Sequence, residues 1–295
     1  MPESTQTAAA GGVLTREQVA TLLLQPLQAA SIFLAAGPRI FDTAGGNNLK
    51  IPKLTGSTGG AWVAEAGPIP DDDVTFGELN LLPTNMKSVK VITKVSDELL
   101  RQSTVALDAV LRARLVADVA ATLDTAFIAS TVTDGTQPLG LLNQPGVQTI
   151  AVGGAITFDV LYDMIGKLLT ANVDATAARW MLTPFVFQAL RKTKSTDGKY
   201  LMQPDVMEQG QFRLLGYPVT VTPRIPTTGS GAFPTKVVLW APSLYAVARD
   251  IAPEVKVLDQ TYAASGQIGI RVQARYDAGP LYPESVVIAT GVNGG

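Results

Sequence analysis

A run of three carboxylates is the first group in this sequence whose chemistry could serve a function. Asp71, Asp72 and Asp73 follow two prolines within the segment AWVAEAGPIPDDDVTF, residues 61–76. Oxygen ligands of this kind suit Ca²⁺ or Mg²⁺. The run lacks, however, the spaced Asp/Asn pattern and the distal bidentate Glu of an EF-hand loop. We therefore favour a solvated acidic bend, or a charged patch that contacts Lys or Arg of another copy of the chain, over a metal site.

Two further patterns are similar to functional motifs but lack a required part. The segment DTAGG, residues 42–46, differs from the Asp-Thr-Gly of aspartic proteases at Ala44 and has no second copy, although that chemistry needs two carboxylates. The glycine-rich stretches at 55–60 and 228–233 lack the Gly-Lys-Ser/Thr ending of a phosphate-binding loop. All three are predicted to be turns.

The absence of two residue types excludes most familiar catalytic centres. The 295 residues include neither histidine nor cysteine. This removes the Ser-His-Asp triad, thiolate nucleophiles, disulfides and nearly every zinc site. A net charge of −2 also argues against the basic stripe that a nucleic-acid-binding protein needs to neutralise phosphates. We expect no enzymatic activity, no catalytic residue, no metal and no cofactor. A hydrolase acting through carboxylates or a Ser–Lys pair is the alternative from the enzyme class.

The elements that would position these residues begin with an N-terminal arm. Residues 1–12 are small and polar, as in a tail, and Thr15 with Gln18 forms a capping box that predicts a helix start. The apolar stretch 19–37 is interrupted by polar residues and by Pro26, so it is predicted to be a buried helix rather than a membrane span.

Residues 49–95 are predicted to form a long hairpin-like excursion. Strand-like runs lie at both ends, at 49–54 and 79–95, and the part between them is rich in Gly, Pro and Thr. Such a loop is too poor in apolar residues to bury Trp62 within the same subunit. We therefore interpret Trp62 as an intersubunit anchor, whereas Trp180 and Trp240, in strand-like runs, are predicted to be core residues.

A long helix is predicted over residues 104–130, which contain neither Pro nor Gly. Its apolar residues form a stripe at helical spacing: Leu115, Val116, Val119, Leu123 and Phe127. Arg112 and Arg114 lie on the same helix close to Asp108 and Asp118. We therefore interpret the two arginines as part of a solvated face or of intersubunit ion pairs rather than as DNA contacts.

The remainder of the chain is predicted to be mixed α+β without the regular βαβ rhythm of a doubly wound fold. Thr157 and Thr183 each precede a predicted helix at an N-cap position. The predicted strands lie at 178–182, 217–223, 236–241, 243–250, 254–259, 268–278 and 284–290.

The order of these elements and of several short motifs resembles a known family. The motifs are WVAEAGPIP (62–70), LLPTNMKSVKVITKVSDELL (81–100), Pro138-Leu139-Gly140, WMLTPFVFQALRKTKSTDGKYLM (180–202), LLGYPVTVTPRIP (214–226) and ARYDAGPLYPESVVI (274–288). From about residue 13 onward the chain resembles the major capsid proteins of tailed bacteriophages with the HK97-type fold. Each motif alone is weak, and the specificity lies in their order and spacing.

The resemblance implies a division of the chain into six segments. They are an N-terminal arm (1–48), an extended loop (49–80), a peripheral domain with a strand and a spine helix (81–139), an axial domain (140–250), a peripheral-domain return (251–276) and a final axial strand with the C-terminal tail (277–295). The extended loop would lie across a neighbouring subunit.

The resemblance also implies the function. Copies of the chain would assemble through pentamers and hexamers into an icosahedral shell that encloses double-stranded DNA, with at most non-specific contact to it, in a virion assembled in the host cytoplasm. Separate scaffold, protease, portal or decoration proteins would be partners, and a membrane would not. The expected intersubunit contact residues are Lys53, Trp62, Val63, Glu65, Ile69, Asp71, Asp72, Asp73, Phe76, Arg112 and Arg114.

Two departures from the family bear on these expectations. Many relatives carry a long N-terminal extension or a fused protease or scaffold that this chain lacks, so either a separate scaffold assists assembly or the chain is a mature or naturally short form. Some relatives cross-link their subunits with the help of a buried Glu, where this sequence has Gln273 and Ala274. We therefore predict no such cross-link, although Lys53 lies in a suitable loop. The shell of a protein nanocompartment is the alternative within the same fold.

Overall fold

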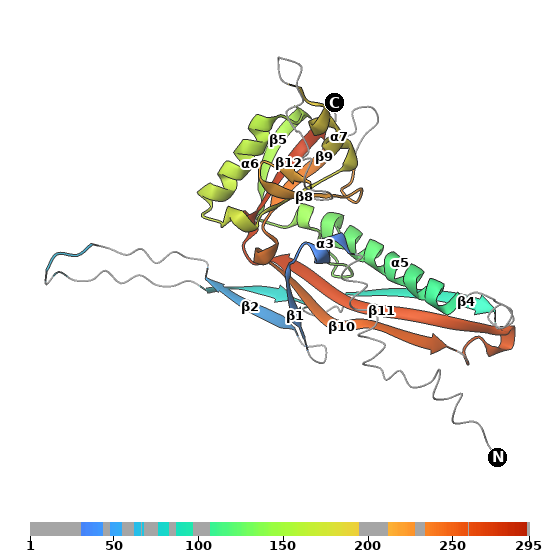
Figure 1. Ribbon diagram of the computed structural model, residues 1–295. Helices are drawn as coiled ribbons and strands as arrows, with labels where there is room; N and C mark the ends of the chain where they lie inside the picture. Colours follow the sequence, from blue (N-terminus) through green and yellow to red (C-terminus); the bar gives the residue numbers. More distant parts are fainter. Residues whose placement is uncertain are drawn as a thin grey trace.

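The computed structural model describes residues 31–43, 48–54, 62–65, 67, 76–82, 87–96, 107–194, 212–227, 234–258 and 260–293. The expectations for residues 1–30 therefore lie outside the described residues. The described part is α+β, as the sequence predicts, with few helices and many strands arranged in two larger sheets and one small hairpin (Figure 1). In the described residues, no helix is both long enough and apolar enough to cross a membrane.

A four-stranded sheet forms the lower body in Figure 1, in the order β1-β10-β11-β4. Its strands are β1 (Arg39–Asp42), β4 (Ser88–Ser96), β10 (Tyr245–Leu258) and β11 (Gln267–Pro280). β10, β11 and β4 are antiparallel, and β1 pairs in parallel with β10. β10 is one strand where the sequence predicts two, at 243–250 and 254–259. It continues through register shifts between Arg249 and Ile251 and between Ile251 and Glu254.

Helix α5 (Leu107–Ala129) lies along one face of this sheet, which confirms the predicted long helix (Figure 1). Leu115, Val119, Leu123 and Phe127 from the predicted stripe are buried. Val116 is only partly buried and packs at the margin of the core. The alternating residues Ile270, Val272, Ala274 and Tyr276 of β11 provide the opposing layer.

A six-stranded sheet forms the upper body, in the order β5-β12-β9-β6-β8-β7. Its strands are β5 (Gln148–Ala155), β6 (Arg179–Leu182), β7 (Arg213–Leu214), β8 (Tyr217–Val221), β9 (Thr235–Trp240) and β12 (Val286–Asn293). The helices α6 (Phe158–Thr170) and α7 (Pro184–Lys192) pack on it, and Thr157 and Thr183 cap them as predicted. Trp180 and Trp240 are fully buried, as expected.

A small hairpin projects from the body beside the four-stranded sheet (Figure 1). It consists of β2 (Leu49–Leu54) and β3 (Phe76–Leu81), which are antiparallel. Its base is anchored by Leu81 and Leu82, which are buried against Ala246, Ala248 and Leu281. A separate apolar cluster therefore holds the hairpin to β10, from which it is distant in the sequence.

The remaining short elements connect these layers. They are α3 (Ile32–Ala35) and the 3-10 turns η1 (Leu141–Asn143), η2 (Ala175–Ala177), η3 (Pro242–Leu244), η4 (Ala263–Ser265) and η5 (Pro283–Ser285).

Candidate functional site

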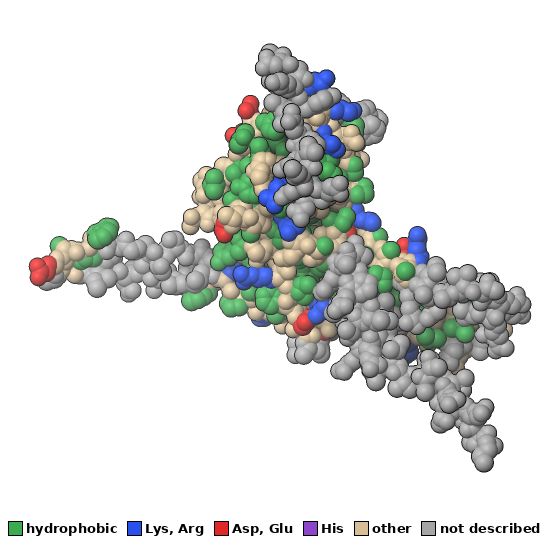
Figure 2. All heavy atoms as spheres, in the orientation of Figure 1, with side chains coloured by type: hydrophobic (Ala, Val, Ile, Leu, Met, Phe, Trp, Pro, Cys, Tyr) green, Lys and Arg blue, Asp and Glu red, His purple; other side chains and the backbone are tan. Residues whose placement is uncertain are grey.

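The far end of the projecting hairpin carries exposed apolar and acidic side chains. Trp62 is completely exposed, at 105% of the reference area, and Val63, Ala64 and Glu65 are exposed as well. Figure 2 shows this hydrophobic and acidic group at the tip, well away from the body. We name residues 62–67 the hairpin tip. The prediction that Trp62 is not buried within its own subunit is thereby confirmed, whereas its role as an anchor stays a prediction.

A tight turn shapes the hairpin tip. The amide of Gly67 donates a hydrogen bond of 2.9 Å to the carbonyl oxygen of Ala64. A Cβ atom at Gly67 would lie 2.8 Å from Cγ1 of Val63, closer than real Cβ contacts come, and 3.1 Å from that carbonyl oxygen, which is a tight contact. Glycine therefore fits this turn without displacing the side chain of Val63, and the neighbouring side chains are exposed to solvent.

The strands that carry the tip hold two more of the predicted contact residues. Phe76 is exposed at the start of β3, and Lys53 is half-buried opposite Gly77. The exposed Glu78 pairs with Lys50 at 3.4 Å. A hydrogen bond from Asn80 and the nearby Lys50 lower the pKa of Glu78.

The other predicted contact residues divide into two groups. The first group, which lies outside the described residues, comprises Ile69, Asp71, Asp72 and Asp73. The structure therefore does not test the metal site considered at the three aspartates. In the part of the chain that is described, no group of three or more carboxylates could hold a metal ion.

The two arginines of the spine helix are the second group. Arg112 lies within α5, but its side chain is not among those described. Arg114 forms an exposed ion pair with Asp118 one turn away, at 3.1 Å. Pairs of this kind contribute about 0.3–0.5 kcal/mol, so the geometry of Arg114 is that of a solvated helix face.

A buried carboxylate that no sequence motif indicated fixes the N-terminus of α3. Asp124, on α5, is 2% exposed. It accepts hydrogen bonds from the hydroxyl of Ser31 (2.6 Å) and from the amides of Ile32 (2.9 Å) and Phe33 (3.1 Å). These are groups at the N-terminus of α3, where amides have no helical partner. A lone Asp among the apolar residues of the stripe is the signal that could have revealed it.

A second buried carboxylate fixes the base of the hairpin. Asp277 of β11 accepts hydrogen bonds from the amide of Leu82 (2.8 Å) and the ammonium of Lys87 (2.7 Å). The side chains of Lys87 and Asp277 are 14% and 2% exposed, so the ion pair is largely removed from water. This carboxylate therefore joins the end of β3 and the start of β4 to the central strand β11.

A third carboxylate links β1 to the same sheet. Asp42 receives two hydrogen bonds from the guanidinium of Arg249, with Nη2 at 2.6 Å from Oδ2. Nearby, burial raises the pKa of Tyr276 to about 12, against a lowering effect of Arg249. In all three cases a carboxylate holds a long-range junction of the chain.

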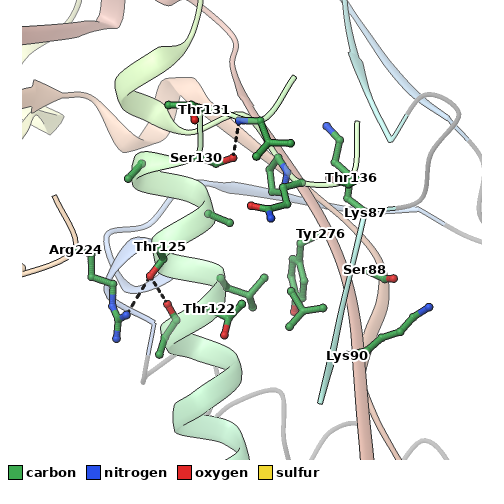
Figure 3. Close-up of a pocket in the computed structure, with 18 residues that line it drawn as sticks. Lys87, Ser88, Lys90, Thr122, Thr125, Ser130, Thr131, Thr136, Arg224 and Tyr276 are labelled. Carbon is green, nitrogen blue, oxygen red and sulfur yellow. Dashed lines mark hydrogen bonds between the residues drawn. The ribbon is translucent and has the colours of Figure 1, made fainter. Parts of the chain in front are cut away.

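A groove of about 690 Å³ runs beside the C-terminal half of α5 (Figure 3). Its walls come from α5, β4, the segment after α5 and Tyr276 of β11. Arg224 borders it on one side of α5, and Lys87 and Lys90 border it on the other. The described lining residues include no Asp or Glu.

Comparison with known protein families identifies the family of this chain. The model of the phage capsid family matches residues 11–291. The chain belongs to the phage capsid family.

Curated relatives support membership of the phage capsid family. The chain is 27% identical to the major capsid protein of Halomonas phage phiHAP-1 over 177 residues, covering 60% of this chain and 29% of that protein. It is 28% identical to the capsid polyprotein of Pseudomonas phage PAJU2 over 190 residues, covering 62% of this chain and 27% of that one. The chain thus matches less than a third of the length of these relatives.

Solved structures with low sequence identity share the fold of this chain. The capsid of a native GTA particle has a TM-score of 0.72 at 17% identity, with 88% of this chain and 90% of that chain covered. A chain of Mycobacterium phage Cain has a TM-score of 0.65 at 18% identity, with 95% and 98% covered. The protein therefore has the HK97-type fold that the sequence motifs predict.

Proposed function

We propose that this chain is the shell subunit of a tailed-phage virion. Copies assemble through pentamers and hexamers into an icosahedral shell that encloses double-stranded DNA. The role is structural rather than catalytic, and assembly takes place in the host cytoplasm with separate scaffold, protease, portal or decoration proteins as partners.

The observation that carries the proposal is the projecting hairpin. A completely exposed Trp62 at the end of an extended element is unfavourable in water, because an indole buries 150–250 Å² when it finds a partner. In a monomer this indole would remain exposed to water, whereas a contact with another protein would bury it. In a family of capsid proteins, the partner is another copy of the chain.

The two sheets support the proposed domains. We assign α5 and the four-stranded sheet to the peripheral domain and the six-stranded sheet with α6 and α7 to the axial domain. Because β10 and β11 lie in the four-stranded sheet over their full length, this assignment places the domain changes near residues 245 and 280. Residues 195–211 and 228–233, within the expected axial domain, lie outside the described residues.

The alternatives receive less support. The relatives reported above are phage capsid proteins, which does not favour a nanocompartment shell. A carboxylate hydrolase needs an acid group that is free to exchange protons with substrate. The buried carboxylates Asp124 and Asp277 are instead committed to backbone amides, a hydroxyl and a lysine.

Particle formation by the full chain tests the proposal. The chain would be expressed with and without the neighbouring genes of its source and characterised by light scattering and electron microscopy. Closed particles with nuclease-protected DNA are the expected result in the phage context. Only monomers or dimers under all assembly conditions would overturn it, and particles filled with an enzyme would favour the nanocompartment.

A further inference from the structure

We propose that the face of the four-stranded sheet that points away from α5 binds the phosphate backbone of double-stranded DNA. The inference rests on the proposed shell function, because the enclosed genome is the polyanion that this face would meet. It names the part of the subunit that makes the contact and the charges that carry it.

The alternation of side chains along β11 separates the two faces of this sheet. Ile270, Val272 and Ala274 belong to the core beneath α5, so Arg271 and Gln273 between them point away from that helix. Residues directly opposite one another on antiparallel strands share a face. We name the three rows that the register places on this face the basic face: Lys256–Arg271–Ile92, Glu254–Gln273–Lys90 and Leu258–Gly269–Lys94.

Cations are crowded at the centre of the basic face. Lys256 lies directly opposite Arg271, an arrangement in which like charges destabilise a sheet. Lys90 and Lys94 are the diagonal neighbours of Arg271, at a backbone separation of about 7–8 Å. Glu254 is the only carboxylate in the three rows, so the basic face carries a net charge of +3, whereas the whole chain carries −2. A bound anion would relieve this repulsion.

The cations of the basic face are accessible to a partner. Lys90, Lys94 and Lys256 are exposed, and Arg271 is half-buried. Within the part of the chain that is described, Lys90, Lys256 and Arg271 form no ion pair. Their charges are therefore available to neutralise an anionic partner.

The ring of Tyr262 holds the remaining cation in place. It packs on Gly269, where a Cβ atom would lie 2.7 Å from Cε2 of the tyrosine. Nζ of Lys94 lies 4.4 Å from the centroid of the same ring, within the range of a cation–π interaction. The ammonium of Lys94 is therefore held at one end of the basic face.

The distribution of charge favours phosphates over an acidic protein segment. Interfaces between proteins are depleted of charged residues, Lys among them, at their centre and are polar at the rim. In the basic face Arg271 and Lys256 lie on the central strands, and the exposed apolar Ile92 lies on the marginal strand β4. Interfaces with DNA are instead strongly positive.

The dimensions of the basic face also suit DNA. Lys90 and Lys94 are four residues apart on one strand, or about 13 Å. Each strand of a duplex carries one phosphate per 3.4 Å of helix axis, so this row faces about four phosphates. Contacts of this kind do not depend on the DNA sequence.

DNA binding by the unassembled full chain tests the charges directly. Subunits would be titrated into a short fluorescent duplex at several salt concentrations. Lys256→Gln combined with Arg271→Gln should weaken binding about tenfold and reduce the slope of log affinity against log salt concentration by about 2. The matched control, Arg191→Gln with Lys192→Gln, removes the same charge from exposed positions of α7 and should change neither quantity. Because the first pair of substitutions relieves repulsion, its denaturant midpoint should stay the same or rise, which separates weaker binding from misfolding.

Lysine reactivity in assembled particles provides a second measurement. Acetylation of Lys90, Lys94 and Lys256 would be compared by mass spectrometry between DNA-filled and DNA-free shells of the wild-type chain, with Lys192 as the reference. We expect these three lysines to react at least about fivefold less in filled shells, where phosphates lie against them.

The outcomes separate this proposal from the shell function. Equal protection in both kinds of shell would overturn it in favour of a protein segment that covers the basic face. It would also be overturned by a wild-type subunit that does not bind the duplex at low salt, or by equal losses in the control variant. Filled shells whose three lysines stay reactive would overturn the DNA contact and leave the shell function intact. Failure of the chain to form shells would overturn the shell function, and the titration would then decide the basic face by itself.

Discussion

The hydroxyl of Ser31 and the carboxylate of Asp124 form a buried hydrogen bond of 2.6 Å across 93 positions of the chain. The same carboxylate accepts hydrogen bonds from the amides of Ile32 and Phe33. Phe33 then stacks on Trp240, with ring centroids 4.9 Å apart, and contacts Phe127 of α5 at 5.2 Å. One carboxylate therefore places α3 between the spine helix and the six-stranded sheet. This junction bears directly on the stability of the subunit.

Removing the carboxylate of Asp124 should destabilise the unassembled subunit. Asp124→Ala leaves two buried amides and a hydroxyl without their acceptor, which costs about 3–5 kcal/mol if they are not resolvated. Urea unfolding of the subunit measures this loss. Asp118→Ala, at a more exposed position of the same helix, should change the free energy of unfolding by about 0.5 kcal/mol or less. Equal effects of the two substitutions would contradict the assigned role of Asp124.

The buried pair at the base of the hairpin should respond unequally to substitution of its two members. Asp277→Ala removes the acceptor of Leu82 and Ala278 and leaves Lys87 unpaired, so we expect a loss of about 3–5 kcal/mol. Lys87→Met keeps the aliphatic stem and leaves Asp277 with its amide donors, so the loss should be smaller. Denaturant unfolding of both variants decides the order, and a larger loss for Lys87→Met would refute this account.

Changes in the hairpin tip should affect assembly without affecting folding. Trp62→Ala removes no contact within the described subunit, so its free energy of unfolding should shift by about 0.5 kcal/mol or less. We expect the same when Asp71, Asp72 and Asp73 are changed to Asn as well. The concentration required for assembly should rise about tenfold or more. Particles that form and survive as in the wild type would show that this loop is not an anchor.

The turn at Gly67 offers a test of the tip's shape rather than its chemistry. Gly67→Ala places a Cβ atom 2.8 Å from Cγ1 of Val63 and 3.1 Å from the carbonyl oxygen of Ala64, so the side chain of Val63 must move and the turn must adjust. We expect impaired assembly with a normally folded subunit. Gly166→Ala is the matched control, because nothing lies within 4 Å of the new Cβ in α6. Alanine is favoured over glycine by about 0.8–1.0 kcal/mol inside a helix, so the control should assemble and be slightly more stable.

Alkaline pH should destabilise the subunit through Tyr276. Its folded-state pKa is raised to about 12 from 10.0, mainly by burial. The folded state therefore holds this proton more tightly, and the resulting stability is present below pH 10 and is lost as the pH rises through 12. A shift of this size corresponds to about 2–3 kcal/mol. Between pH 9 and 12 the free energy of unfolding should fall less steeply with pH for Tyr276→Phe than for the wild type. Equal dependence on pH in the two proteins would contradict the prediction.

The sequence by itself determined the local elements and the family. The helix predicted at 104–130 is present as Leu107–Ala129, because an uninterrupted run with an apolar stripe encodes both its period and its buried face. Thr157 and Thr183 cap their helices as expected, because an N-cap bonds to an amide only three residues away. Strand β5 was not predicted, although residues 148–155 alternate in exposure.

The tertiary structure alone decided the junctions and the groove. Apart from the adjacent Ala278, the partners of Asp124 and Asp277 lie 91 to 195 positions away along the chain, with Lys87 and Leu82 at the longer separations. No local pattern encodes such a partner, because the free energy of a buried carboxylate depends on which donors the fold brings to it. The groove likewise combines Lys90, Thr125 and Arg224 from three separate segments. The sequence thus placed Trp62 in a loop that cannot bury it, whereas only the packing of α5 against β4 formed the groove.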